Sequence, residues 1–146
     1  IGLMGILADT VLQEGGKVIG VMPQLLEEKE IAHSHLTELF IVDSMHERKA
    51  KMAELAEGFI TLPGGPGTME EFFEVFTWAQ IGLHKKPFGL LNSNGYYNPL
   101  LAVLEHMVQE QFMQEIYQKM VVVESDPVQL LEKLKFFKPP LVKYDK

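Results

Sequence analysis

The sequence predicts an α/β fold with a doubly wound parallel sheet and helices on both faces. Three observations predict it: short apolar runs, longer segments of helical periodicity between them, and turn residues at the junctions. Nearly continuous apolar runs are typical of parallel strands that are buried on both faces. The regular alternation of strand and helix favours right-handed crossovers that cover both sides of one sheet.

The expected elements follow from these patterns in chain order. Strands are expected at Val18–Met22, Leu39–Asp43, Gly58–Leu62, Pro87–Leu91 and Met120–Val123. Helices are expected at Leu3–Glu14, Met45–Glu57, Thr68–Leu83, Pro99–Glu115 and Pro127–Leu134. Gly15–Gly16 ends the earliest helix, because glycine tolerates the left-handed conformation of a helix cap, and Asn94–Gly95 marks a turn. The polar stretch Pro23–Thr37 is expected to form a surface loop.

The first residues differ from the usual start of an α/β domain. Residue 1 is isoleucine, and the helical pattern begins at Leu3 with no strand and no capping residue before it. Since such a sheet normally opens with a strand, we expect an upstream strand–helix–strand segment of roughly 30 residues or more. Residues 1–146 are thus expected to form a single α/β domain that lacks its N-terminal strands, and to be poorly soluble when made alone.

Composition restricts the classes of site and partner. Hydrophobic residues make up 47% and charged residues 23% of the 146 residues, which suits one globular domain. The absence of cysteine excludes disulfides, zinc-thiolate sites and thiol nucleophiles. A net charge of −7 argues against nucleic acid as a partner, because its phosphates attract basic surfaces. With no signal-peptide pattern and no apolar run long enough to span a bilayer, we expect a cytoplasmic protein without a membrane partner.

The most informative segment is GFITLPGGPGTMEE, which runs from Gly58 to Glu71. An expected strand leads into the glycine-rich loop 63–67, and an expected helix begins at Thr68. Glycines let a ligand approach the backbone closely, and a helix N-terminus offers unpaired N–H groups and a positive dipole end to a phosphate. The loop also lies where ligands bind in open α/β sheets, at the carboxyl end of a strand. The sequence therefore predicts a phosphate-binding loop.

Two familiar motifs are excluded here, and structural interpretations stay open. A Walker loop needs a lysine where Gly67 stands, and a dinucleotide fingerprint needs a third glycine where Glu70 stands. The loop could be an ordinary strand-to-helix turn. Thr68 and Glu71 also fit a capping box, in which the two residues satisfy each other's backbone donors, and this would explain Glu71 without any catalytic role.

One face of the expected helix carries two carboxylates and an indole. Glu71, Glu74 and Trp78 share that face at helical spacing. The stripe that packs into the core is made of apolar residues, namely Met69, Phe72, Phe73, Phe76 and Ala79. The alternative is a solvated acidic face with Trp78 at the edge of the core.

A second charged helix is expected to begin directly after a strand, with the sequence MHERKAKM at 45–52. Charged runs on helices are usually solvated pairs, and Lys51 fits this interpretation with Glu47 and Glu54 in helical reach. Arg48 differs, because its neighbours at three and four residues are not acidic. Its planar guanidinium is therefore expected to be available for a phosphate or a carboxylate.

Together the two segments resemble the LOG ("Lonely guy") family, the cytokinin riboside 5′-monophosphate phosphoribohydrolases, often labelled lysine decarboxylases. The pattern that carries the resemblance is Met45-x-x-Arg48-Lys49 followed by Pro63-Gly64-Gly65-x-Gly67-Thr68-x-x-Glu71. It extends through Gly2–Gly5, Val18–Pro23, Thr77–Gln80 and Asn94–Tyr97. The resemblance implies a Rossmann-like sheet and a homodimer with active sites near the dimer interface. It also implies hydrolysis of the N-glycosidic bond of an adenosine 5′-monophosphate, with or without an N6 substituent.

The resemblance assigns roles to particular residues. Arg48 and Glu71 match the catalytic arginine and glutamate of the family, and the loop would hold the 5′-phosphate. The residues expected to bind substrate are Met45, Lys49, Gly64, Gly65, Gly67, Thr68 and Glu74. A carboxylate beside the ribose can stabilise the oxocarbenium-like transition state or activate water, and this is the role expected of Glu71. Arg48 would neutralise the phosphate or assist the departing base.

Other chemistries find less support in the sequence. The reaction requires no metal and no cofactor. His33 and His35 lack a third nearby ligand and are expected to be loop surface. Lys85–Lys86 follows a helix end, where cations suit the dipole, and nothing nearby suggests a pyridoxal site. A non-catalytic nucleotide sensor or carrier on the same scaffold stays open, although a pure binder would not need both Arg48 and Glu71.

Overall fold

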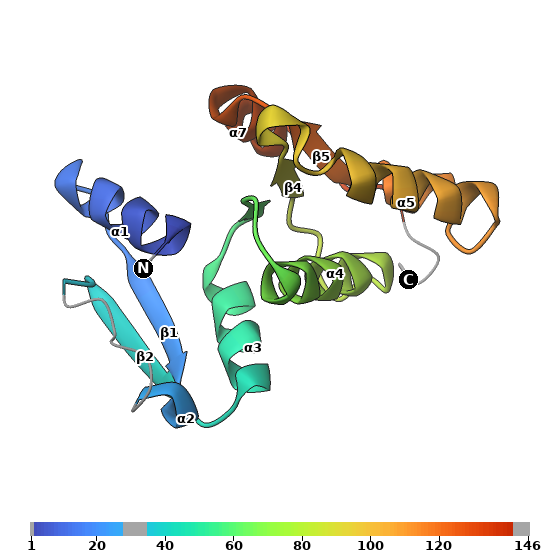
Figure 1. The fold of residues 1–146 in the computed structure, drawn as a ribbon. Coiled ribbons are helices and arrows are strands. Elements are labelled where there is room, and N and C mark those ends of the chain that lie inside the picture. The colour runs from blue at the N-terminus through green and yellow to red at the C-terminus, as the bar shows by residue number, and fades with distance from the viewer. Residues whose placement is uncertain (1, 28–34, 142–146) are drawn as a thin grey trace. The chain divides into compact units, whose positions relative to one another are not determined.

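The computed structural model describes residues 2–27 and 35–141 of the chain. It divides into two compact units, Ile1–Ala56 and Glu57–Lys146 (Figure 1). Each unit combines parallel strands with flanking helices, so the α/β class and the parallel pairing are confirmed. The prediction of a single domain is not tested by this division and stays a prediction.

The first unit has a two-stranded parallel sheet. Its elements in chain order are α1 (Leu3–Gln13), β1 (Ile19–Pro23), α2 (Gln24–Glu27), β2 (Glu38–Val42) and α3 (Met45–Leu55). Ile19 of β1 lies opposite Glu38 of β2, and the register continues to Pro23 opposite Val42. Gly15 has a φ of 78° just after α1, as expected for a glycine that closes a helix. Helix α3 packs against both strands.

The second unit has a three-stranded parallel sheet in the order β3-β4-β5. Its elements are β3 (Phe59–Thr61), α4 (Pro66–Gln80), β4 (Phe88–Leu91), the 3₁₀ turn η1 (Ser93–Gly95), α5 (Asn98–Gln109), α6 (Glu115–Gln118), β5 (Val121–Glu124) and α7 (Pro127–Lys135). Phe88 of β4 lies opposite Phe59 of β3 and Val121 of β5. Among the described residues, β3 is thus the edge strand that leads into the glycine loop.

Helices cover both faces of this sheet, as alternate residues of β4 show. Phe88 and Leu90 point into a core shared with α4 and α5. Gly89, between them, faces the other side, where a Cβ would lie 2.9 Å from Leu130 of α7 and 2.7 Å from the Val122 carbonyl oxygen. The glycine therefore lets α7 approach the sheet closely. The predicted covering of both faces is confirmed in this unit (Figure 1).

The core of the second unit is aromatic and forms around the predicted apolar stripe of α4. Its buried members are Phe72, Phe76, Ala79, Phe88, Leu90, Tyr97, Leu104, Met120 and Val121. Met69 and Phe73 pack against this cluster while partly exposed. Burying each large apolar side chain contributes roughly 1.5–3 kcal/mol, so this packing fixes α4 against β4. The position of the glycine loop follows from that packing.

Several boundaries differ from the sequence prediction. Every predicted strand is found within one residue of its expected ends, and β3 is one residue shorter at each end. Helix α4 begins at Pro66 instead of Thr68, because proline suits the first turn of a helix, and ends at Gln80 before Gly82. Helix α5 ends at Gln109 instead of continuing to 115, because Gln111 takes a left-handed φ of 63°.

The expected loop at 23–37 is corrected in part. Residues 24–27 form the single turn α2, while residues 28–34, with His33, lie outside the described residues. None of the helices within the described ranges is long and apolar enough to cross a membrane.

Candidate functional site

The first turn of α4 is the centre of the candidate site. Gly65 is its N-cap, Pro66 is its first residue, and no side chain caps the helix. The first backbone bond of the helix runs from the N–H of Met69 to the Gly65 carbonyl oxygen, at 3.1 Å. Within residues 2–27 and 35–141, the N–H groups of Gly67 and Thr68 make no hydrogen bond. These unpaired donors form the positive end of the helix dipole.

The capping-box interpretation of Thr68 and Glu71 is wrong. Because α4 begins at Pro66, Thr68 is the third residue of the helix and cannot be its N-cap. Its side chain instead folds back over the loop. A Cβ built on Gly64 would lie 2.2 Å from the Thr68 hydroxyl oxygen, so glycine is required at position 64. The structural explanation for Glu71 is thereby removed.

Glu71 shares a small pocket with Thr68. The pocket has a volume of about 120 Å³ and is lined by Phe59, Thr61, Thr68, Glu71, Phe72, Val75 and Phe88. Thr68 and Glu71 are one helical turn apart and so lie on the same face of α4. The residues that the structure describes include no hydrogen-bond or ion-pair partner for the Glu71 carboxylate. The structure thus brings a predicted phosphate-loop residue and the predicted catalytic carboxylate to one pocket.

The first turn of α3 is arranged differently. Ser44 is its N-cap, and the serine hydroxyl oxygen accepts a hydrogen bond from the Glu47 N–H at 3.1 Å. The Glu47 carboxylate accepts a hydrogen bond from the Asp43 N–H at 3.0 Å. Glu47 therefore serves its own helix. Lys51 pairs with Glu54 at 3.3 Å, as one of its two expected partners.

Arg48 is half-buried and lies within the first turns of the same helix. Its Nε is a buried nitrogen with no hydrogen-bond partner, and it is the one such side-chain atom among the described residues. An unpaired buried donor costs about 1–3 kcal/mol, and more when it is charged. The prediction that Arg48 lacks a partner on its helix is confirmed. A buried polar atom without a partner calls for an explanation, and a bound ligand is one such explanation.

The other predicted site residues lie on the same two helices. Met45 is 41% exposed at the start of α3. Lys49 and Glu74 are half-buried, and each takes part in an interaction, so neither is a free charge. Arg48 and its neighbours belong to the first unit, whereas the glycine loop and Glu71 belong to the second.

Two tyrosines that sequence reasoning did not assign to the site brace the glycine loop. The Tyr96 hydroxyl donates to the Gly64 carbonyl oxygen at 2.7 Å, and the Tyr97 hydroxyl donates to the Leu62 carbonyl oxygen. Burial raises the pKa of Tyr97, and the charge of the neighbouring Tyr96 raises it further. The predicted turn at Asn94–Gly95 was the signal that could have pointed to these residues, because it returns the chain toward the loop.

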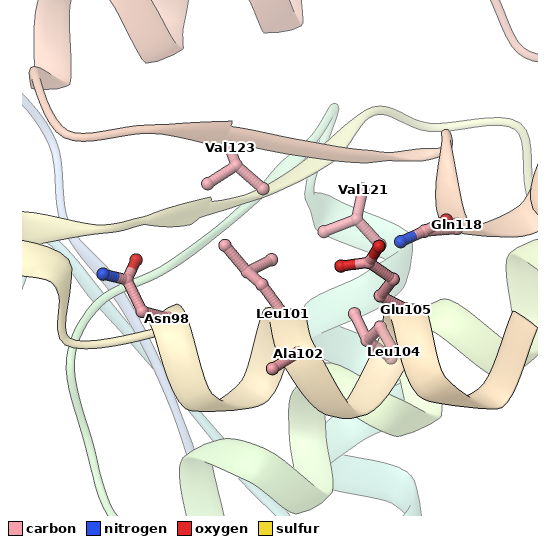
Figure 2. Close-up of a pocket in the computed structure, with 8 residues that line it drawn as sticks. All are labelled: Asn98, Leu101, Ala102, Leu104, Glu105, Gln118, Val121 and Val123. Atoms are coloured by element: carbon pink, nitrogen blue, oxygen red, sulfur yellow. The ribbon is translucent and has the colours of Figure 1, made fainter. Parts of the chain in front are cut away.

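A larger pocket of about 470 Å³ lies between α5 and β5 and shares no lining residue with the pocket of Thr68 and Glu71 (Figure 2). It is lined by Asn98, Leu101, Ala102, Leu104, Glu105, Gln118, Val121 and Val123. Figure 2 shows the Glu105 carboxylate turned toward the Gln118 amide. With one carboxylate and no cation in its lining, this pocket does not suit a phosphate.

His35 is described and His33 is not. Over the described ranges, no group of three or more His, Asp or Glu side chains is placed to hold a metal ion.

Comparison with known proteins places this geometry in a family. The model of a family described as "Possible lysine decarboxylase" matches residues 4–134. A cytokinin riboside 5′-monophosphate phosphoribohydrolase of Rhodococcoides fascians is 53% identical over 127 residues, or 86% of this chain and 64% of that protein. The cytokinin riboside 5′-monophosphate phosphoribohydrolases LOG5 of Arabidopsis thaliana and LOG of Oryza sativa subsp. japonica are each 45% identical over 139 residues.

The chain spans 61% of the length of LOG5 and 57% of the length of LOG, while 95% of its own length is covered in both comparisons. It thus spans less than two thirds of each of these relatives. The family model nevertheless matches most of the chain. The chain therefore belongs to the LOG ("Lonely guy") family, as its two sequence motifs predict.

Proposed function

We propose that this protein hydrolyses the N-glycosidic bond of a nucleoside 5′-monophosphate and releases the free base and ribose 5-phosphate. The substrate class is adenosine 5′-monophosphate, with or without an N6 substituent. The observation that carries the proposal is the uncapped first turn of α4, with Thr68 and Glu71 at one pocket. The names of the similar proteins, which are phosphoribohydrolases, support the same reaction class.

The 5′-phosphate would bind at the start of α4. The unpaired N–H groups of Gly67 and Thr68 can donate to its oxygens, and the Thr68 hydroxyl adds a third donor. Gly64 and Gly65 permit the approach, since neither presents a side chain. A net charge of −7 repels anions at long range, so the local field of this helix end must supply the attraction.

Glu71 would act on the sugar. Cleavage breaks the bond between C1′ of the ribose and the base nitrogen, and positive charge develops on the sugar ring. The Glu71 carboxylate can stabilise that charge, or take a proton from the water whose oxygen bonds to C1′. The electron pair of the broken bond leaves with the base, which is protonated as it departs. A carboxylate that is not used as a helix cap is free for this step.

Arg48 would supply positive charge, either to the phosphate or to the departing base. Its unpaired buried Nε supports a ligand-binding role. Met45, Lys49 and Glu74 are proposed as further substrate contacts. A homodimer and a cytoplasmic location are proposed on the grounds given by the sequence, and the reaction needs no metal and no cofactor.

The test is chromatography of reactions with AMP, N6-prenyl-AMP and adenosine, with detection of free base and ribose 5-phosphate. We expect base from the two monophosphates and far less from adenosine, because only the monophosphates can use the loop. Equal rates for AMP and adenosine would contradict a phosphate anchor. Binding of AMP without any release of base would favour a non-catalytic nucleotide sensor or carrier.

A further inference from the structure

We propose that Tyr96 is a positioning residue that aims the backbone N–H of Gly65 at the 5′-phosphate of the substrate. The contact that carries the inference joins the Tyr96 hydroxyl to the Gly64 carbonyl oxygen at 2.7 Å. The inference rests on the proposed function for the identity of the ligand, whereas the contact itself is a feature of the folded chain.

A hydrogen-bonded turn after β4 brings Tyr96 to the loop. Gly95 has a left-handed φ of 70°. The Asn92 side chain accepts a hydrogen bond from the Tyr97 N–H at 2.7 Å and donates one to the Asn98 side chain at 2.8 Å. A Cβ on Gly95 would lie 2.7 Å from the Asn98 amide nitrogen, so a larger residue at position 95 would displace the Asn98 side chain. This network holds the turn that carries Tyr96.

The bond from Tyr96 fixes the direction of one backbone donor. The peptide between Gly64 and Gly65 is trans and planar, so the Gly64 carbonyl and the Gly65 N–H point in opposite directions. With the carbonyl held toward Tyr96, the N–H is directed away from it. Gly65 is the N-cap of α4, and its N–H has no hydrogen-bond partner in the described part of the chain. This donor therefore adds to those of the first helical turn.

Without the Tyr96 hydroxyl, the same peptide would be free to turn over. Two consecutive glycines make such a rotation easy, because glycine accepts φ values of either sign. A rotated peptide would present the Gly64 carbonyl oxygen where the Gly65 N–H had pointed, and that oxygen would repel a phosphate. The hydroxyl bond thus selects the orientation that attracts the anion.

Tyr97 offers a matched control on the same loop. Its hydroxyl holds the Leu62 carbonyl oxygen, but the next residue is Pro63, whose nitrogen carries no hydrogen. Holding that carbonyl therefore aims no donor. Tyr97 is 1% exposed and Tyr96 is 52% exposed. Loss of the Tyr97 hydroxyl removes the partner of the Leu62 carbonyl oxygen at a buried side chain that water does not reach, whereas water can replace the exposed Tyr96 hydroxyl.

The experiment measures binding of ribose 5-phosphate to the purified wild-type protein, to Tyr96→Phe and to Tyr97→Phe by calorimetry, with thermal unfolding of all three. For Tyr96→Phe we expect a Kd about tenfold higher, the size of one weakened charge-assisted hydrogen bond, at an unchanged unfolding temperature. For Tyr97→Phe we expect a lower unfolding temperature and a Kd within roughly twofold of wild type. An unchanged Kd in Tyr96→Phe, or an equal rise in both variants, would overturn the proposal.

Turnover of AMP separates this proposal from the proposed function. In Tyr96→Phe the loss should fall on KM and not on kcat, because the Glu71 carboxylate is untouched. If wild type binds ribose 5-phosphate in a Tyr96-dependent way but releases no base from AMP, the proposed function fails and the positioning role stands. If wild type releases base and Tyr96→Phe keeps the wild-type KM, the positioning role fails and the function stands.

Discussion

Helices α3 and α4 each begin shortly after a parallel strand ends, yet their first turns are satisfied by different groups. In α3, the Ser44 hydroxyl oxygen accepts a hydrogen bond from the Glu47 N–H at 3.1 Å, and the Glu47 carboxylate accepts one from the Asp43 N–H at 3.0 Å. In α4 the N-cap is Gly65, followed by Pro66, and no side chain caps the helix. Both helices present the same backbone donors and the same dipole. The capping residues alone decide whether these donors are occupied.

The difference teaches where an anion can bind. A helix that supplies its own carboxylate has little affinity left for a phosphate, so we propose that α3 contributes through the side chain of Arg48 and not through its first-turn N–H groups. Helix α7 resembles α3, because Asp126 accepts a hydrogen bond from the Gln129 N–H at 2.9 Å. The glycine and proline at the start of α4 are what leave its donors to a ligand. The predictions below alter one helix end at a time.

Glu71→Gln tests the largest effect at the α4 end. If Glu71 is catalytic, this change should lower kcat by roughly 10²–10⁴, with the circular dichroism spectrum and unfolding temperature retained. Glu70→Gln, the adjacent exposed carboxylate, should keep the wild-type rate and serves as the control. A Glu71→Gln variant with full activity would remove Glu71 from the mechanism.

Arg48→Met tests the cation of α3 whose Nε has no partner among the described residues. Methionine replaces a buried, unpaired donor with an apolar chain, so we expect unchanged or slightly higher stability and a fall in kcat/KM of roughly 10²–10³. Stability is measured by urea denaturation and activity by release of base from AMP. Lys51→Met is the control, since Lys51 pairs with Glu54 and lies over Phe40 at 4.9 Å. Full activity in Arg48→Met would exclude a role in binding or catalysis.

Three helices end at a residue with a left-handed φ, and the sequence predicts these ends to different degrees. Gly15 was predicted to end α1, and its φ of 78° confirms it. Gly82 has a φ of 77° and follows the end of α4 at Gln80. The sequence predicts a later end, because the apolar pattern continues to Leu83. Gln111 ends α5 with a φ of 63° and no glycine at all. Glutamine is not a residue type that favours a left-handed helix end, so no local rule indicates this one.

In the candidate site, too, local sequence predicts some features and misses others. The glycine loop and the lack of a partner for Arg48 on its own helix follow from local spacing, and the sequence predicts both. The start of α4 was misplaced by two residues, because Thr68 is a good N-cap residue and Pro66 a good first residue, and propensity did not decide between them. Tyr96 was missed as a brace because its partner Gly64 is 32 positions away. Such long-range contacts depend on how β3 and β4 pair.

Gly65→Asp gives α4 the kind of cap that α3 has. Position 65 has room, since a Cβ there meets nothing within 4 Å, and its φ of −91° suits any residue. An aspartate cap should stabilise the protein by about 0.5–1 kcal/mol and raise KM for AMP at least about tenfold by competing with the phosphate. Gly65→Ser, a neutral cap, should raise KM less. A KM that Gly65→Asp leaves unchanged would place the phosphate elsewhere.

Ser44→Ala removes the cap from α3 and is expected to have the smallest effect. Loss of the serine hydroxyl should lower the free energy of unfolding by about 1 kcal/mol, as measured by urea denaturation. KM for AMP should stay within roughly twofold of wild type, because the Glu47 carboxylate still lies at that helix end and continues to repel a phosphate. The phosphate therefore has no reason to move from α4 to α3. A KM that changes more in Ser44→Ala than in Gly65→Asp would place the anion at α3, and the open end of α4 would then need another explanation.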